Sequence, residues 1–135
     1  MSTDLATRYA MKREMDMPVP EAEEWVRLAL GEEGFGILTE IDVTSVFKKK
    51  LGESFRPYRI LGACNPSLAH QAITAEIDIG LLLPCNVIVY EGDREGTSVV
   101  AAIDPVAQLG IAEREDLRPM AEEVKARLER VLAAV

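Results

Sequence analysis

Residues 81–103, LLLPCNVIVYEGDREGTSVVAAI, carry the clearest structural signal in the chain. The first part of this segment is apolar and becomes rich in β-branched residues toward Tyr90, as is typical of a strand. A polar segment, EGDREG, follows over residues 91–96, and residues 97–103 are again apolar and β-branched. Two such runs around a glycine-containing turn predict a β-hairpin, with a loop longer than the tightest types.

Immediately upstream, residues 58–64 (YRILGAC) predict a short strand that is followed by a helix. Asn65 is a favoured N-cap residue, and Pro66 suits the first helical position because no N–H is needed there. The apolar residues of the predicted helix recur at three-to-four spacing: Leu68, Ala69, Ala72, Ile73 and Ile77. Gly80 follows at its expected end.

The remaining segments extend this alternation of strands and helices. Strands are predicted over 8–15 and 35–43, and helices from Pro20 to about Leu30, from Asp42 or Thr44 to Leu51 (ended by Gly52), and from Asp116 to Val135. The order predicts an α+β fold with two layers, in which an about five-stranded, largely antiparallel sheet has helices packed on one face. The other face must be wet or covered by a second subunit. The apolar run 81–90 favours the second alternative, so we expect a homodimer.

Composition limits the classes of function. A chain of 135 residues is the usual size of one domain, so we expect a single domain over residues 1–135. It contains no stretch of eighteen apolar residues, and its first residues lack the pattern of a secretion signal, so we expect no membrane contact and a cytoplasmic location. The formal net charge of −8 argues against a broad nucleic-acid interface, which needs clustered Lys and Arg.

One basic segment departs from this acidic background. Lys48, Lys49 and Lys50 are consecutive, and Arg56 and Arg59 follow shortly after them. Cations at the end of a short helix are stabilised by the negative end of its dipole, which makes a solvated helix terminus the simpler interpretation. The alternative is an anion-binding or phosphoester-binding corner.

The residues best suited to form a site are Cys64, Asn65, Pro66, Cys85 and Asn86. Because Cys64 directly precedes a helix N-terminus, amide groups and the helix dipole there would lower its thiol pKa and favour a nucleophilic thiolate. The alternative is that each cysteine is a small buried apolar side chain. Parallel strands would separate the two thiols by a strand length, whereas antiparallel strands would make them neighbours, and the sequence leaves both arrangements open.

Other chemical motifs are weak or missing from the sequence. His70 is the only histidine, and no paired Cys or His spacing resembles a zinc site. There is no phosphate loop, dinucleotide fingerprint or Gly-x-Ser-x-Gly elbow. We therefore expect no metal and no cofactor, and the sequence alone does not decide whether the protein is an enzyme.

Three stretches resemble a known family. Residues 58–66 (YRILGACNP), residues 81–91 (LLLPCNVIVYE) and the pair Asp104-Pro105 before a long helix are similar to the family called "domain of unknown function 302". The segments containing Glu40 to Val43 and Lys49 to Gly52 also resemble it, so the similarity spans nearly the whole chain. The resemblance implies a small α+β domain of the TATA-binding-protein-like class, often a homodimer, and it implies no established reaction.

These observations lead to three functional hypotheses. The first is a dimeric ligand-binding or interaction domain, with a small-molecule site around Cys64, Asn65, Pro66, Cys85 and Asn86. The second is a thiol-dependent redox enzyme or sulfur carrier that uses Cys64, with Cys85 as its resolving partner. The third is an anion or phosphoester binder that uses the basic segment.

Overall fold

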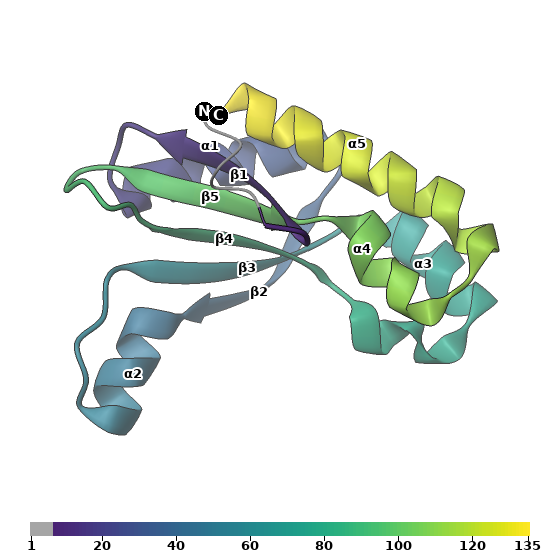
Figure 1. The fold of residues 1–135 in the computed structure, drawn as a ribbon, viewed down its shortest axis with the longest axis horizontal. Helices are drawn as coiled ribbons and strands as arrows, with labels where there is room; N and C mark the ends of the chain where they lie inside the picture. Colours follow the sequence, from purple (N-terminus) through teal and green to yellow (C-terminus); the bar gives the residue numbers. More distant parts are fainter. Residues whose placement is uncertain (1–6) are drawn as a thin grey trace.

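The computed structural model describes residues 7–135, which form a five-stranded sheet with helices on one face and beyond its ends (Figure 1). The strands are β1 (Ala10–Met15), β2 (Gly36–Asp42), β3 (Tyr58–Cys64), β4 (Cys85–Glu91) and β5 (Ser98–Ile103). Their order across the sheet is β1-β5-β4-β3-β2, and every neighbouring pair is antiparallel. The hairpin expected over residues 81–103 is confirmed as the β4–β5 pair.

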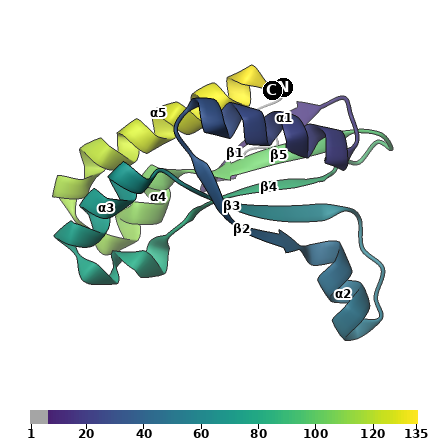
Figure 2. The ribbon, with the colours of Figure 1, turned by 180° about the vertical axis from the view of Figure 1, so that it is seen from behind.

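The helices are α1 (Val19–Glu32), α2 (Val43–Leu51), α3 (Pro66–Ala75), α4 (Pro105–Leu109) and α5 (Arg118–Ala134), with short 3₁₀ helices over Ile77–Leu82, Gly110–Ala112 and Glu115–Leu117. Helices α1 and α5 lie on the same side of the sheet (Figure 2). This arrangement confirms the predicted two-layer α+β fold. None of the helices within residues 7–135 is both long enough and apolar enough to cross a bilayer.

The main core lies between the sheet and helices α1 and α5. Residues on alternate positions of the central strands point toward these helices, including Leu61 of β3, Val87 and Val89 of β4, and Val100 of β5. All four are buried, and the helices contribute Val26, Leu30, Leu128 and Val131. The apolar side chains at every second strand position and at every third or fourth helix position thus pack together in one layer.

A second apolar cluster lies beyond one end of the strands, where α3, α4 and the start of α5 come together (Figure 1). Its buried members are Ala72, Ile79, Leu109, Leu117 and Ala121. Helix α4 was not expected from the sequence. Asp104 begins it by accepting a hydrogen bond from the Val106 amide at 2.9 Å, so the Asp-Pro pair that ends β5 also starts a helix.

Two boundaries differ from the sequence-based expectation. Helix α3 ends at Ala75, so Ile77 does not continue its apolar stripe and is 79% exposed. Strand β4 begins only at Cys85, because the 3₁₀ helix Ile77–Leu82 occupies the first part of the apolar run. The apolar content of this segment does not distinguish a strand from a helical turn. The structure has a helical turn here, and its Ile79 packs in the second apolar cluster.

Helix α2 projects away from the end of the sheet (Figures 1 and 2). It begins as expected, because the Asp42 carboxylate accepts a hydrogen bond from the Ser45 amide at 3.0 Å. It ends at Gly52, which adopts a left-handed backbone with φ of 68° that favours glycine. No residue of α2 is buried.

We expect Leu61→Ala to lower the free energy of unfolding by about 2–5 kcal/mol, because it opens a cavity in the centre of the core. Leu61 is 0% exposed, whereas Leu81 is 87% exposed, so Leu81→Ala is a matched control. The control should change stability by less than about 0.5 kcal/mol. Urea denaturation followed by circular dichroism measures both values, and equal losses would contradict the assignment of Leu61 to the core.

Candidate functional site

The two cysteines lie at one end of the neighbouring strands β3 and β4. These strands are antiparallel, and Cys85 is directly opposite Ala63, the residue before Cys64. Adjacent strands are about 4.8 Å apart, so the backbones of the two cysteines are close neighbours. The structure therefore supports the antiparallel alternative that the sequence left open. Cys64 is half-buried, Cys85 is buried, and both are free thiols.

Asn65 begins α3 in the way that its residue type suggests. Its side-chain oxygen Oδ1 accepts a hydrogen bond from the Leu68 amide at 3.2 Å, and Pro66 occupies the first helical position. Pro66 is exposed. Asn86 is opposite Gly62, and because alternate strand residues point to opposite faces, it lies on the other side of β4 from Cys85. Cys64, Asn65 and Cys85 thus line one cavity, and Asn86 is not among its lining residues.

A small apolar cavity lies beside the two cysteines. Its lining comes from both strand ends and from α3, α4 and α5: Phe35, Ala63, Cys64, Asn65, Leu68, Ala69, Ala72, Leu83, Pro84, Cys85, Pro105, Leu109, Met120 and Val124. Its volume is about 30 Å³, which is the space that one water molecule takes up in the liquid. The cavity therefore lies where the sequence predicted a site, and it is far smaller than a typical metabolite pocket of about 300 Å³ or more.

The electrostatics of the two thiols differ from the sequence-based expectation. Burial raises the pKa of Cys64 above its ordinary value, whereas proximity to a helix N-terminus was expected to lower it. Burial, together with the charge of Cys64, raises the pKa of Cys85 to about 11. The Leu68 amide at the start of α3 is not free, because it donates its hydrogen bond to the Asn65 side chain. Both thiols are therefore protonated at neutral pH, which disfavours a nucleophilic role.

Gln108 is a site residue that the sequence did not reveal. It lies on α4, and its side-chain amide donates hydrogen bonds to the backbone oxygens of Leu82 and Pro84. Its oxygen Oε1 accepts a hydrogen bond from the Cys85 thiol at 3.6 Å. Gln108 thus fixes both the segment before β4 and the orientation of Cys85. It was missed because the helix that carries it was not predicted.

The sheet side that faces away from α1 and α5 is a second candidate surface, which we call the open face. Residues directly opposite one another in antiparallel strands share a face, so the register defines its members. They are Ala10, Lys12, Glu14, Thr39, Ile41, Tyr58, Ile60, Gly62, Asn86, Ile88, Tyr90, Val99, Ala101 and Ile103. Among these described strand residues, only Lys12 and Glu14 are charged, and both lie on the edge strand β1.

The open face is apolar through its middle and aromatic toward one end. Ile41, Ile60, Ile88 and Ala101 form one row across four strands, and Ile41 is 44% exposed. Beside this row, the rings of Tyr58 and Tyr90 stack with centroids 5.5 Å apart. A shallow apolar hollow of about 160 Å³ lies at the other end, next to Asn86 and Ile88. Wet faces of antiparallel sheets are normally polar, whereas this one is apolar, with Ile60 and Ile88 half-buried and Ala101 buried within the chain itself.

The aromatic end continues from the sheet onto the projecting helix. Phe55 lies 6.2 Å from Tyr58 and 5.3 Å from Phe47 of α2, measured between ring centroids. Four of the seven aromatic side chains of the chain thus form one connected row, Phe47, Phe55, Tyr58 and Tyr90. Phe55 is 45% exposed, so this row is an accessible extension of the open face.

The basic segment does not form a single cationic corner. Lys48, Lys49 and Lys50 are exposed in the last turn of α2, whereas Arg56 lies near Asp93, with 3.6 Å between Nη1 and Oδ1. Arg59 donates hydrogen bonds to Glu23, at 2.8 Å from Nε to Oε1.

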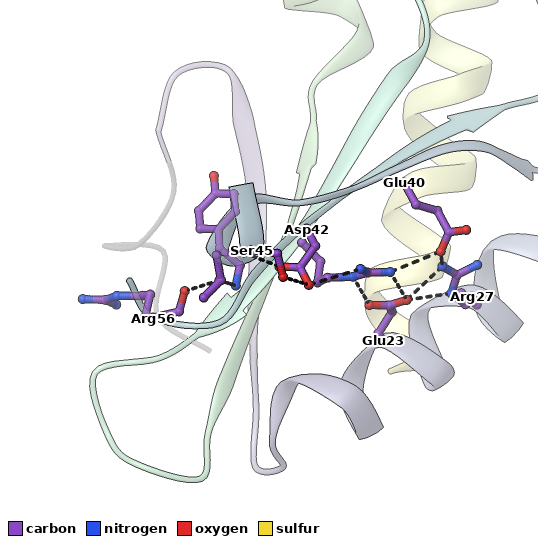
Figure 3. A network of polar contacts seen from close by, with 9 residues as sticks. Glu23, Arg27, Glu40, Asp42, Ser45 and Arg56 are labelled. Carbon is purple, nitrogen blue, oxygen red and sulfur yellow. Dashed lines mark hydrogen bonds and ion pairs between the residues drawn. The ribbon is translucent and has the colours of Figure 1, made fainter. Parts of the chain in front are cut away.

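Arg59 belongs to a network of opposite charges that joins α1, β2 and β3. Figure 3 shows this network, in which Arg27 contacts both Glu23 and Glu40. Arg59 is also near Glu40 and Asp42. Two arginines therefore face three carboxylates, which leaves no excess positive charge here for an anion.

A cluster of metal-ligating side chains is absent from the part of the chain that the structure describes. No group of three or more His, Cys, Asp and Glu side chains within residues 7–135 is arranged to hold a metal ion. His70, the single histidine of the sequence, is exposed on α3.

Fold and site together define a class of protein. It is a small α+β domain with an antiparallel sheet in the order β1-β5-β4-β3-β2, an apolar open face and a thiol-lined cavity at one strand end. The model of the family "Domain of unknown function DUF302" matches residues 11–135. The chain belongs to this family, as its sequence resemblance indicated.

A solved structure supports the same assignment. The chain is similar to the crystal structure of an uncharacterized conserved DUF302 protein from Bacillus stearothermophilus, with 27% identity and a TM-score of 0.86. The match covers 95% of this chain and 98% of that one. A search of curated proteins gave no match.

Alkylation kinetics test whether Cys64 is an activated thiol. Because burial raises the pKa of Cys64, we expect it to react with iodoacetamide at pH 7 more slowly than free cysteine, with a midpoint above the ordinary pKa of 9.0. Buried Cys85 should react only when the protein unfolds. The variants Cys64→Ala and Cys85→Ala separate the two signals in mass spectrometry. A Cys64 midpoint below 9.0 would restore the thiol-enzyme hypothesis.

The charge network gives a pH-dependent prediction. Burial raises the pKa of Glu23, but hydrogen bonds from Arg59 and Arg27 outweigh this effect and hold it below 4.5. The ionised Glu23 carboxylate therefore stabilises the folded protein at pH values above 4.5. This stabilisation is lost as the pH falls through the lowered pKa of Glu23. Glu23→Gln should cost about 1–3 kcal/mol at pH 7.

Denaturant titrations at pH 7 and at pH 3 measure this difference. Glu24→Gln is the matched control, because Glu24 is an exposed neighbour on the same helix. We expect the difference in free energy of unfolding between wild type and Glu23→Gln to be smaller at pH 3 than at pH 7. A difference that does not change with pH would contradict the role of the carboxylate charge.

Proposed function

We propose that this chain is a non-catalytic interaction domain that works as a homodimer, joined through the open face of its sheet. The observation that carries this proposal is the apolar and nearly charge-free character of that face. Exposed apolar surfaces of this kind are costly in water and mark interaction sites in monomeric folds. Interface centres are likewise poor in charge and rich in aromatic residues.

The charge distribution of the chain favours a second copy of the same chain as the partner that covers the open face. The chain has a formal net charge of −8, so two copies repel each other unless they meet through a neutral surface. The open face meets this condition, because Lys12 and Glu14 are its only charged strand residues among those described and have opposite signs. A two-fold interface brings the same patch of each copy together, which a neutral apolar row allows.

The aromatic row extends the same surface. Phe47 and Phe55 continue the line of Tyr58 and Tyr90 onto α2, whose apolar side chains find no buried position within their own chain. A partner seated on the open face would cover part of this helix as well. We place this function in the cytoplasm, where two free cysteines stay reduced.

Sedimentation equilibrium tests the homodimer. Wild type should have about twice the 14.9 kDa mass of the chain, whereas Ile88→Asp should be monomeric because it buries two like charges opposite each other. Ile41→Asp, on the edge strand β2, is a second variant with less effect on folding. Leu28→Asp is the matched control, since Leu28 is 61% exposed on α1, away from the open face.

The control should remain dimeric, and circular dichroism must show that every variant is folded. A wild type that stays monomeric up to about 0.1 mM, a concentration that would populate even a weak dimer, overturns the proposal. A dimer that persists in both Ile88→Asp and Ile41→Asp places the interface elsewhere and also overturns it.

A second candidate function is ligand binding in the cavity beside Cys64 and Cys85. What favours it is the position of this cavity at the strand ends, where residues of α3, α4 and α5 contribute to its lining. Its volume of about 30 Å³ restricts the ligand to a very small group. A screen of metabolites by thermal shift tests this candidate, because a ligand that binds only the native state raises the melting temperature.

A further inference from the structure

Helix α2 carries apolar side chains that its own chain leaves uncovered. The helix has nine residues, none of which is buried, and isolated helices of this length are only marginally stable in water. Val46 is 44% exposed and Leu51 is 67% exposed, while Phe47 contacts the half-exposed ring of Phe55. Much of α2 is therefore a surface that a partner can still cover.

The basic residues of the same helix have no carboxylate partner within residues 7–135. Lys48, Lys49 and Lys50 are exposed and form no ion pair there, although the chain has a net charge of −8. Most of the described arginines, in contrast, contact a carboxylate of their own chain: Arg27, Arg56, Arg59, Arg94, Arg114, Arg118, Arg127 and Arg130. Apolar side chains beside three unpaired cations are complementary to an acidic partner surface.

The register of the sheet places α2 at the same end as two exposed carboxylates. Asp42 at the end of β2, Ser98 at the start of β5 and Met15 at the end of β1 all lie at this end. Helix α2 follows one edge strand, whereas Asp16 follows the other edge strand, on the opposite side of the sheet (Figure 1). Glu95 lies in the turn that leads into β5, the neighbour of β1.

Asp16 and Glu95 together are called the acidic edge here. Both are exposed, and neither forms an ion pair with another residue that the structure describes. One end of the sheet thus has three unpaired cations at the β2 edge and two unpaired carboxylates near the β1 edge. The two groups lie on different sides of the same end, so they suit a contact between two copies of the chain.

We propose that in the homodimer α2 of each copy packs against the acidic edge of the other copy, with Lys48, Lys49 and Lys50 facing the partner's Asp16 and Glu95. This inference rests on the proposed homodimer and adds its orientation and a second contact surface. When two open faces stack, a two-fold axis parallel to the strands reverses the strand order and keeps the strand ends together. Strand β2 of one copy then lies over β1 of the other, and the projecting α2 reaches the acidic edge. Symmetry repeats this contact in the second copy.

Charge distinguishes this orientation from the other one that a two-fold axis allows. An axis perpendicular to the strands keeps β2 over β2 and exchanges the strand ends, which brings α2 toward the segment after α3 (Figure 1). In residues 76–82, Glu76 is already paired with Arg114, and Asp78 is the exposed carboxylate that has no ion pair. The three lysines would meet one unpaired carboxylate there, compared with two at the acidic edge.

Charge reversal followed by sedimentation equilibrium tests the contact on the full chain. Replacing all three lysines (Lys48→Glu, Lys49→Glu, Lys50→Glu) should raise the dimer Kd by about 10-fold or more, because like charges then face each other. Asp16→Lys combined with Glu95→Lys should weaken the dimer in the same way. A chain with all of these reversals restores opposite charges, so its Kd should return to within about three-fold of the wild-type value. At about 1 M salt, where the Debye length is about 3 Å, these differences in Kd should largely disappear.

Glu32→Lys combined with Glu129→Lys is the matched control for the acidic edge. It changes the net charge by the same amount, and both residues are exposed on α1 and α5, which cover the other side of the sheet. This control should not weaken the dimer. Circular dichroism must show that every variant is folded. Recovery in the fully reversed chain also shows that the lysine variant did not act merely by unfolding α2.

Each remaining outcome counts against the contact. An unchanged Kd in the lysine variant, or no recovery in the fully reversed chain, overturns it, and the dimer through the open face then stands on the separate Ile88→Asp result. A dimer that is weakened by Asp78→Lys and not by the acidic-edge variant has the other orientation, which also overturns it. A wild type that is monomeric at about 0.1 mM overturns both the contact and the homodimer.

Discussion

Antiparallel pairing of β3 with β4 is the constraint on which the rest of the structure depends. These two strands are the centre of the sheet and its link to β2, and their register sets Leu61 against Val87 in the core and Ile60 against Ile88 on the open face. A slip of one residue would exchange the two sets, exposing the core residues and burying the open face against α1 and α5. The same register places Cys85 opposite Ala63, next to Cys64. Core, open face and cavity are thus three consequences of one alignment.

The alternation of side chains explains why a motif that is continuous in sequence serves two surfaces. Cys85 points toward the core side and lines the cavity, whereas Asn86 points to the open face and borders its apolar hollow. The run from Cys85 to Tyr90 is apolar almost throughout because the strand is covered on one side by helices and is apolar on the other. A strand with a wet outer face would have alternated with polar residues. The hydrophobic pattern therefore reflects a strand that has apolar side chains on both faces.

Sequence reasoning was most accurate where one residue determines local geometry by itself. Asn65 caps α3, Asp42 caps α2 and Gly52 ends it, because side-chain oxygens and a left-handed glycine act within a few residues. Prediction from the sequence failed where contacts between residues far apart in the chain determine the secondary structure. Residues around Ile79 form a 3₁₀ helix because Ile79 enters the second apolar cluster, and α4 forms where it can close the strand end through Gln108. Neither effect leaves a local signal.

The thiols show why a correct local structure can still give the wrong chemistry. Asn65 begins the helix as expected, but the cap itself takes up an amide that was expected to stabilise the sulfur of Cys64. Residues of three helices pack around the strand ends, and the partial loss of water favours the neutral thiol. A helix terminus stabilises a thiolate only when its amides are free and its charge is solvated or paired. Here neither condition holds, so burial keeps both thiols in their neutral form at neutral pH.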